Sequence, residues 1–452
     1  MTDRRPTAMD KAKKQWEVMA LNALLIFFMN FAIFLSVPPQ IKIFEDIICR
    51  KIHLDNALNL HPGDDDSCRG ALVQTELARI NGWKTTFEAL PSIWSDVLPL
   101  RLVWLSGLLR SIGGGEPVID SIMAVMVMDV FEERDRDTVT LLTLLILSAV
   151  ALLRLHSVFI VAKILAAPTS AAVVALGSPW TPFMLSLVIL SAAQVLSFLL
   201  PETLGYAEPQ EPDDNRTRRS ITEKKGNLIQ KFALSAKFVV QNPNMVPIII
   251  VNLVASITKS SSNFLLQYSS TRYGWSYSLS SLVLMIREAS SLITYLVLTP
   301  AASAAIRRIG RGSVTAQDKR LCQAGGLLNV FGYFSIATAA TPVLFMLALA
   351  FLSLGSGFDT VVTSFATSLV QPHQIVSLHL VAATAKSIGG LVGGPLFARL
   401  MQVGFELGSG WLGMPYIAAG LFFFAVLLAL SSIRIQSRNL DETEQPLLPT
   451  DV

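Results

Sequence analysis

The sequence is short of charged residues. Of its 452 residues, 15% are charged and 52% are hydrophobic, whereas about 25% of residues are charged in a soluble domain. The mean hydropathy of +0.52 agrees with this deficit. A soluble globular protein is therefore excluded, and the net charge of +3 is too small to indicate a nucleic-acid partner.

Residue patterns that indicate catalysis or ATP hydrolysis are also lacking. The five histidines include no pair with the spacing of metal ligands on a helix, because His373 and His379 are six residues apart and lie on different faces. No Gly-x-x-x-x-Gly-Lys loop, which cradles phosphates, occurs. We therefore expect no enzyme, no metal site and no cofactor.

Cysteine is scarce as well. The chain has three cysteines, too few for a disulfide scaffold. Cys322 lies in an apolar stretch and is expected to be inert. Cys49 and Cys68 share one polar loop, where they can pair if that loop faces an oxidising compartment. A cleavable signal is not expected, because the first apolar run is long and lacks a small-residue cleavage site.

Long apolar runs are what the sequence does contain. They are continuous, without the alternation of a strand, and a helix of roughly 20 residues matches about 30 Å of hydrocarbon. We predict an all-α polytopic membrane protein with about ten transmembrane helices, four before a polar connector and six after it. The predicted spans are Trp16–Val37, Leu98–Met128, Val158–Leu176, Thr181–Leu200, Met245–Gln267, Tyr277–Ala302, Leu321–Ala340, Pro342–Val370, Ile375–Met401 and Trp411–Ile433.

A polar stretch rich in Lys and Arg, 201–244, divides the chain. Basic residues gather on the cytoplasmic side of membrane proteins, so we predict a cytoplasmic connector here. It separates an incomplete N-terminal bundle, 1–200, which includes an outer loop at 38–97, from a six-helix bundle, 245–435. Residues 436–452 are expected to form a disordered cytoplasmic tail. An even number of spans places both termini in the cytoplasm.

Three stretches of the first half need separate treatment. Pro38-Pro39 is expected to end the first span, and the amphipathic segment Ala71–Leu90 carries too many charges to cross a bilayer. The forty residues Thr138–Gly177 are too many for one helix. We expect one span there, Val158–Leu176, with Thr138–Leu153 as a helical extension or a partial insertion.

Short motifs spread over most of the chain carry a family resemblance. They are Arg101-Leu102-Val103-Trp104 before Gly113–Gly115, Ser178-Pro179-Trp180-Thr181-Pro182, Pro201-Glu202-Thr203-Leu204, Tyr273-Gly274-Trp275, Gly355-Ser356-Gly357, Ile388-Gly389-Gly390 and Gly413-Met414-Pro415-Tyr416. In this order they resemble a major facilitator superfamily transporter, and more specifically the fungal drug and secondary-metabolite efflux pumps. The resemblance implies two helical bundles around a shared pathway for a small molecule.

The sequence departs from that family in its first half. Family members have two halves of six helices and a Gly-x-x-x-Asp-Arg-x-Gly-Arg turn between the second and third. No such turn lies between Pro91 and Leu98, and the span that resembles the fourth helix follows almost at once. The chain is therefore predicted to lack the second and third helices. The partial counterpart in the second half, Arg307-Arg308-Ile309-Gly310-Arg311-Gly312, lacks the aspartate.

Ionisable residues inside the predicted spans are the candidates for substrate and proton handling, because charge at the midplane is costly. Arg287 and Glu288 lie in the middle of Tyr277–Ala302, and the angle of about 100° between neighbours lets at most one of them face a cavity. Glu288 is the first choice for proton coupling. The alternative is a structural ion pair of Glu288 with Arg287 or Lys259.

Other polar residues in the spans are weaker candidates. Asp359 and Lys386 lie near the midpoints of later spans, and a mutual ion pair would explain both. Arg110 resembles the buried arginine of the family's fourth helix, which the resemblance implicates in proton transfer. Uncharged polar residues line the cavity or bond to neighbouring helices, at about 0.6 kcal/mol each. The cavity candidates of this kind are Asn252, Asn263 and Gln194.

Together these features predict a secondary active transporter that exports a small amphipathic metabolite or drug in exchange for protons. The two halves would rock around a midplane site, which opens to one side at a time. The alternatives are a nutrient importer, for example of a sugar, and a transport-inactive membrane protein or scaffold, which the missing helices favour. We expect a monomer in the plasma membrane, with a vesicular or vacuolar membrane as the alternative.

Overall fold

The computed structural model describes residues 8–55, 68–95, 157–175, 178–197, 244–309, 314–370 and 375–433. Within these ranges every regular element is a helix, which confirms the all-α prediction. The labelled elements are α1 (Ala8–Asp55), α3 (Ala71–Ser95), α7 (Trp180–Ser197), α10 (Met245–Lys259), η3 (Ser260–Phe264), α11 (Leu265–Tyr273), α12 (Tyr277–Ile293), η4 (Thr294–Leu298), α13 (Thr299–Ile309), α14 (Val314–Thr338), α15 (Pro342–Ser353), α16 (Phe358–Ser368), α17 (Ile375–Leu407), η6 (Ser409–Trp411) and α18 (Met414–Ser432). One more helix spans Ser157–Ala175.

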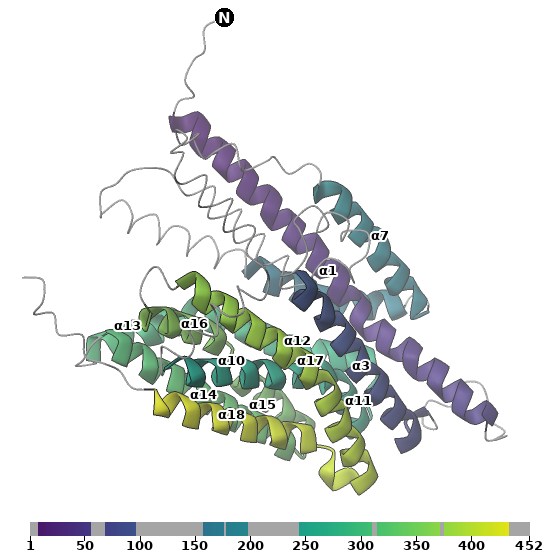
Figure 1. The fold of residues 1–452 in the computed structure, drawn as a ribbon. Helices are drawn as coiled ribbons and strands as arrows, with labels where there is room; N and C mark the ends of the chain where they lie inside the picture. The colour runs from purple at the N-terminus through teal and green to yellow at the C-terminus, as the bar shows by residue number, and fades with distance from the viewer. Residues whose placement is uncertain are drawn as a thin grey trace, which may run out of the picture.

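The helices form two groups (Figure 1). Helices α1 and α7 lie side by side in one group, and α10 to α18 form a compact bundle in the other. Helix α3 lies between the groups and packs against both α1 and α17. This is the two-bundle arrangement that the sequence predicts.

An aromatic centre holds the C-terminal bundle together. Tyr268 on α11 is fully buried, and its ring centroid lies 6.0 Å from that of Phe345 and 4.8 Å from that of Tyr416. Its hydroxyl donates a hydrogen bond to the Ile336 carbonyl oxygen at 3.0 Å. A buried tyrosine with a satisfied hydroxyl combines a large apolar contact with a fixed orientation. Tyr268 therefore links α11 to α14, α15 and α18.

Seven described helices are long and apolar enough to cross a membrane. Four of them coincide with predicted spans to within three residues at each end: Ser157–Ala175, Tyr277–Ala302, Pro342–Ser368 and Met414–Ser432. Helix α7, predicted as a full span, is a shorter apolar helix. The predicted span Leu98–Met128, the segment Thr138–Leu153, most of the connector and the tail lie outside the described residues.

The prediction that Pro38 and Pro39 end the first span is wrong. Helix α1 continues through both prolines to Asp55, and its apolar part runs from Ala20 to Ile52. Each proline removes one backbone donor, but membrane helices tolerate this because neighbouring groups satisfy the freed carbonyl. The segment predicted as an outer loop therefore begins as a helix.

Part of the predicted outer loop, 38–97, is also helical: α3 lies within it and packs along α17. The Thr86 hydroxyl donates to the Leu391 carbonyl oxygen at 3.3 Å, and the Gln402 amide donates to the Thr75 carbonyl oxygen at 3.3 Å. Leu391 and Gln402 both belong to the span Val381–Leu407. On the exposed side of α3, Glu76 and Arg79 pair with each other.

Two glycines of α17 allow α10 to approach closely. A Cβ atom added at Gly389 would lie 2.6 Å from the Leu253 carbonyl oxygen, and one at Gly393 would lie 2.8 Å from the Ile257 carbonyl oxygen. No real side chain occupies such a position. Small residues four apart are a common means of close backbone packing between membrane helices.

Replacing Gly393 with leucine is expected to prevent stable assembly of the C-terminal bundle. Overpacking costs about 1–3 kcal/mol, and more where a backbone must move. The measurement is the yield of monodisperse protein in fluorescence-detected size-exclusion chromatography. Gly410→Leu is the matched control, because a side chain there meets open space. Equal losses for the two variants would contradict the packing argument.

Candidate functional site

Glu288 lies near the middle of α12, where the two groups of helices meet. Its carboxylate is 3.2 Å from Lys163 Nζ and 3.8 Å from Arg287 Nη1. Lys163 belongs to the helix Ser157–Ala175, which precedes the connector, whereas Arg287 is on α12 itself. The side chains of Glu288 and Lys163 are 19% and 21% exposed. Lys163 and Glu288 thus form an ion pair that joins the two groups of helices, and both side chains are mostly buried.

Aromatic rings hold the Lys163 ammonium in place. Its Nζ lies 4.6 Å from the ring centroid of Phe34 on α1 and 5.3 Å from that of Phe159. An ammonium over a ring face gains about 0.5–2 kcal/mol, the upper value when it is desolvated. Sequence reasoning missed Lys163, although it is the single charged residue of its predicted span.

Further charges surround the pair. Lys259, at the end of α10, is exposed and lies within electrostatic reach of Glu288. Arg287 and Asp359 both lie within electrostatic reach of Tyr295 and Tyr333. Glu288 therefore lies close to several cations, of which Lys163 and Arg287 form ion pairs with it.

A π-helical turn brings Tyr295 into this group. The turn, η4, follows α12 directly, and the Tyr295 hydroxyl donates to the Ser356 carbonyl oxygen at 2.7 Å. Turns of this kind insert an extra residue, which changes the direction of the side chains that follow, and they are frequent at functional sites. The turn links α12 to the start of α16, where Asp359 lies.

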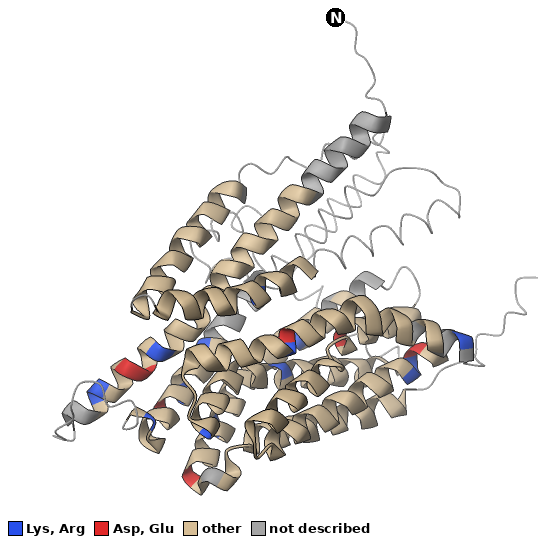
Figure 2. Cartoon of the chain, turned by 180° about the vertical axis from the view of Figure 1, so that it is seen from behind, with Lys and Arg blue, Asp and Glu red and all other residues tan. Residues whose placement is uncertain are grey.

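Charge is otherwise rare in the helices. Figure 2 shows most of the described ribbon without charge, with a small red and blue group near the middle of the C-terminal bundle and the rest near helix ends. Within the described residues, no group of three or more His, Cys, Asp or Glu side chains is placed to hold a metal ion. The central group is therefore the strongest candidate for handling ions or substrate.

The expected ion pair between Asp359 and Lys386 is not among the ion pairs of the described residues. Asp359 lies in the first turn of α16, near Tyr295 and Tyr333. Lys386 lies on α17, whose backbone at this residue accepts a hydrogen bond from Ser256 of α10 at 2.6 Å. The two residues thus lie against different neighbours, which sequence spacing does not reveal.

The uncharged candidates divide into three situations. Asn252 is buried and donates to the Ile248 carbonyl oxygen of its own helix at 2.8 Å. Asn263 is exposed and donates to Thr85 Oγ1 of α3 at 3.3 Å, so it lies between the two groups. Gln194 is on α7, which packs against α1. Arg110 lies outside the described residues.

A disulfide joins Cys49 of α1 to Cys68, with the Cα atoms 5.3 Å apart. The free Cys322 is buried. Cross-linking residues 19 apart reduces the entropy of the unfolded chain, which is worth roughly 3 kcal/mol for a loop of that size. The disulfide therefore fastens the end of α1 to the segment that leads into α3.

Cys68→Ser is expected to lower the unfolding temperature of the purified protein by several degrees, since one cross-link of roughly 3 kcal/mol is lost. Nanoscale fluorimetry in detergent measures this. Cys322→Ser serves as the control for loss of a thiol. A reducing agent should destabilise the wild type and leave Cys68→Ser unchanged, and the opposite pattern would contradict the structural role of the disulfide.

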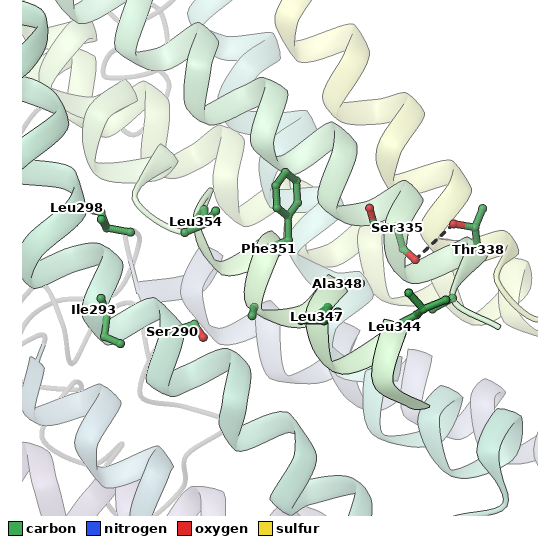
Figure 3. A pocket seen from close by; sticks show the side chains of 12 residues that line it. Ser290, Ile293, Leu298, Ser335, Thr338, Leu344, Leu347, Ala348, Phe351 and Leu354 are labelled. Atoms are coloured by element: carbon green, nitrogen blue, oxygen red, sulfur yellow. Dashed lines mark hydrogen bonds between the residues drawn. The ribbon is translucent and has the colours of Figure 1, made fainter. Parts of the chain in front are cut away.

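A hollow of about 690 Å³ is lined by no charged residue (Figure 3). It is a groove between α12, η4, α14 and α15, and Figure 3 shows Ile293, Leu298, Leu344, Leu347 and Phe351 along it. These side chains are between 37% and 62% exposed and belong mostly to membrane spans. Such a surface fits contact with lipid. The groove is therefore not the candidate transport site.

Relatives of known family decide the class of this protein. The MFS-type transporter avaK of Aspergillus versicolor is 74% identical over 465 aligned residues, which cover all of both chains. The chain belongs to the major facilitator superfamily. The MFS efflux pump atnC of Emericella nidulans is 24% identical over 96% of this chain and 91% of that protein. No family model matches the sequence.

Solved structures agree with this major facilitator assignment at the level of the fold. The human organic anion transporter MFSD10 (TETRAN) superposes with a TM-score of 0.54 at 13% identity, over 92% of this chain and 99% of that one. Membership of the major facilitator superfamily, shown by the similarity to avaK, makes the protein a multi-pass membrane transporter of small molecules, and proteins of this superfamily are not enzymes.

This chain and avaK have nearly the same length. The alignment has 465 positions against 452 residues here, which leaves room for at most 13 additional residues in avaK. Two membrane helices need about 40 residues. The alignment therefore leaves no room in avaK for two further helices that this chain lacks.

Proposed function

We propose that this chain exports a small amphipathic metabolite or drug in exchange for protons. The observation that carries the proposal is the carboxylate of Glu288, held between Lys163 of the first half and Arg287 of the second. Charged groups at the midplane of a membrane bundle are expensive and are retained where they serve transport. The name of the relative atnC, an efflux pump, supports the outward direction.

Proton exchange at Glu288 would couple to movement of the two halves. While Glu288 is ionised, its attraction to Lys163 joins the helix Ser157–Ala175 to α12. A proton that binds Glu288 from the outside removes the negative charge, so the halves separate more easily at this point. Release of that proton to the cytoplasm restores the pair. Each cycle thus moves one proton inward while substrate moves outward.

The character of the helices supports an amphipathic substrate. The candidates lie on helices that are apolar over most of their length, such as Met245–Tyr273 and Tyr277–Ala302. A sugar would need a cavity rich in hydrogen-bonding groups. Two exposed side chains would contact the polar part of a substrate: the amide of Asn263, which faces α3, and the cation Lys259, which lies within electrostatic reach of Glu288.

Efflux from intact cells tests the proposal. Cells that express the protein at the plasma membrane are loaded with Nile red, a fluorescent hydrophobic compound, and compared with cells that carry the empty vector. The proposal predicts lower accumulation in the expressing cells. Equal accumulation in both would overturn the exporter proposal and favour a transport-inactive membrane protein.

A further inference from the structure

A second carboxylate, Glu45, is buried near the end of α1. The residue is 3% exposed, although Lys42 and Asp46 lie beside it on the same helix. Its Oε1 accepts a hydrogen bond from Gln74 Nε2 at 2.6 Å and another from the Tyr277 hydroxyl at 3.0 Å. Its Oε2 lies 3.3 Å from Lys42 Nζ. Glu45 thus joins α1 to α3 and to α12.

The hydrogen bonds continue from Gln74 into the C-terminal bundle. Gln267 Nε2 of α11 donates to Gln74 Oε1 at 3.0 Å and to the Gln74 carbonyl oxygen at 2.8 Å. Gln74 is 1% exposed and Gln267 is 0% exposed. We call Glu45, Gln74, Gln267 and Tyr277 the Glu45 cluster. Bonds between groups so deeply buried cannot be replaced by water unless the helices separate.

The Glu45 cluster lies at the end of the molecule that the sequence places outside the cell. It is at the end of α1 opposite the basic N-terminus, and the disulfide of Cys49 lies one turn further along. At the same end Arg69 donates to the Gly274 carbonyl oxygen at 2.9 Å. A small cavity of about 140 Å³ lies beside the cluster, and its lining includes Lys42, Glu45, Arg69 and Tyr277.

We propose that Glu45 is a positioning residue that holds the outer end of the transport pathway closed. Its carboxylate keeps α1 and α3 against α11 and α12, and all bonds of the Glu45 cluster that cross between the two groups break when the pathway opens outward. The disulfide makes the end of α1 and the start of α3 move together. This inference rests on the proposed function only in assuming that the two groups separate during transport.

The side-chain chemistry predicts a graded effect of substitution. Glu45→Leu removes every polar contact and leaves Gln74 and Tyr277 without their acceptor. Glu45→Gln keeps the volume and one acceptor oxygen for Tyr277, but it loses the charge that attracts Lys42. Because hydrogen bonds to a charged group are the stronger ones, even Glu45→Gln weakens the closed state.

Labelling of a cysteine beneath the Glu45 cluster tests the proposal. Asn263 lies one turn of helix before Gln267 and is exposed between the two groups. In an Asn263→Cys background, a membrane-impermeant maleimide applied to intact cells reaches the thiol from outside only when the outer end opens. The native cysteines do not compete, because two are disulfide-bonded and Cys322 is buried.

We expect Glu45→Leu to accelerate this labelling about tenfold or more, the effect of losing a strong hydrogen bond from a two-state equilibrium. Glu45→Gln should accelerate it less. Glu76→Gln is the matched control, because Glu76 pairs with Arg79 on the exposed side of α3. If Glu45→Leu does not reach the cell surface, the labelling rate of Glu45→Gln is the test, because this variant preserves the side-chain volume.

Unchanged labelling in the Glu45 variants would overturn the inference, whatever the wild type transports. Faster labelling together with no export of Nile red by the wild type would leave the role of Glu45 standing and reject the exporter proposal. Export by the wild type together with unchanged labelling would support the exporter proposal and reject the role of Glu45. The two proposals therefore fail separately.

Discussion

Glu288→Gln is expected to reduce Nile red export to the level of cells without the protein. The substitution keeps the shape of the side chain but removes the charge that Lys163 and Arg287 face at 3.2 and 3.8 Å. A glutamine cannot take up and release a proton, so proton exchange can no longer drive substrate export. The measurement is Nile red accumulation, normalised to the amount of protein at the cell surface.

Glu406→Gln provides the control for this experiment. Glu406 forms an exposed ion pair with Arg399 on α17, and its side chain is 56% exposed. Surface pairs of this kind are worth about 0–1 kcal/mol, so export should stay at the wild-type rate. Full export by Glu288→Gln would remove Glu288 from the mechanism and leave the exporter proposal intact.

Lys163→Met is expected to cause the second largest loss, about tenfold or more in export rate. Removing one partner of a fully buried pair costs on the order of 3–5 kcal/mol, and this partly buried pair should cost less, because solvent screens part of the remaining charge. Glu288 would then keep Arg287, 3.8 Å away on its own helix, and the exposed Lys259 as its nearby cations. Lys163→Arg keeps the cation and the contacts with Phe34 and Phe159, and it should retain much of the activity.

A double variant separates the structural effect from the transport effect. Lys163→Met with Glu288→Gln removes both charges, so no uncompensated charge remains. Its unfolding temperature should exceed that of Lys163→Met, although the double variant does not export Nile red. If the losses in unfolding temperature simply add, the two residues do not interact, and the ion pair between the halves is refuted.

Periodicity and hydropathy predicted most of the helices but not the ends of all of them. The apolar pattern predicts the span Tyr277–Ala302 at its observed bounds, and in the structure the Ser276 side chain caps its first turn. Pro38 and Pro39 predict the end of a helix, and this rule holds for helices in water. In a membrane the cost of exposing a backbone is higher, so α1 continues through them.

The candidate site was predicted in part. Glu288 stood out because a carboxylate inside an apolar span is rare, but its partner Lys163 lies 125 positions earlier in the chain and on another helix. Spacing along one helix shows which residues share a face and says nothing about the helix opposite. The suggested pair of Asp359 with Lys386 failed for that reason.

Glu45 shows a second limit of sequence reasoning. It lies among Lys42, Asp46 and Arg50, and such a run is normally a solvated face at the end of a span. Its burial depends on Gln74 and Tyr277, which come from two other helices. Polar groups that satisfy one another across helices are therefore visible only once the helices are assembled.

The most direct test of proton-coupled export through Glu288 is the rate of Nile red efflux from preloaded cells at two external pH values. One value equals the cytoplasmic pH and the other is more acidic. We expect faster efflux by the wild type at the acidic value, because an inward proton gradient then drives the exchange, and no such acceleration in Glu288→Gln. Efflux by the wild type that is independent of external pH, or acceleration retained in Glu288→Gln, would contradict it.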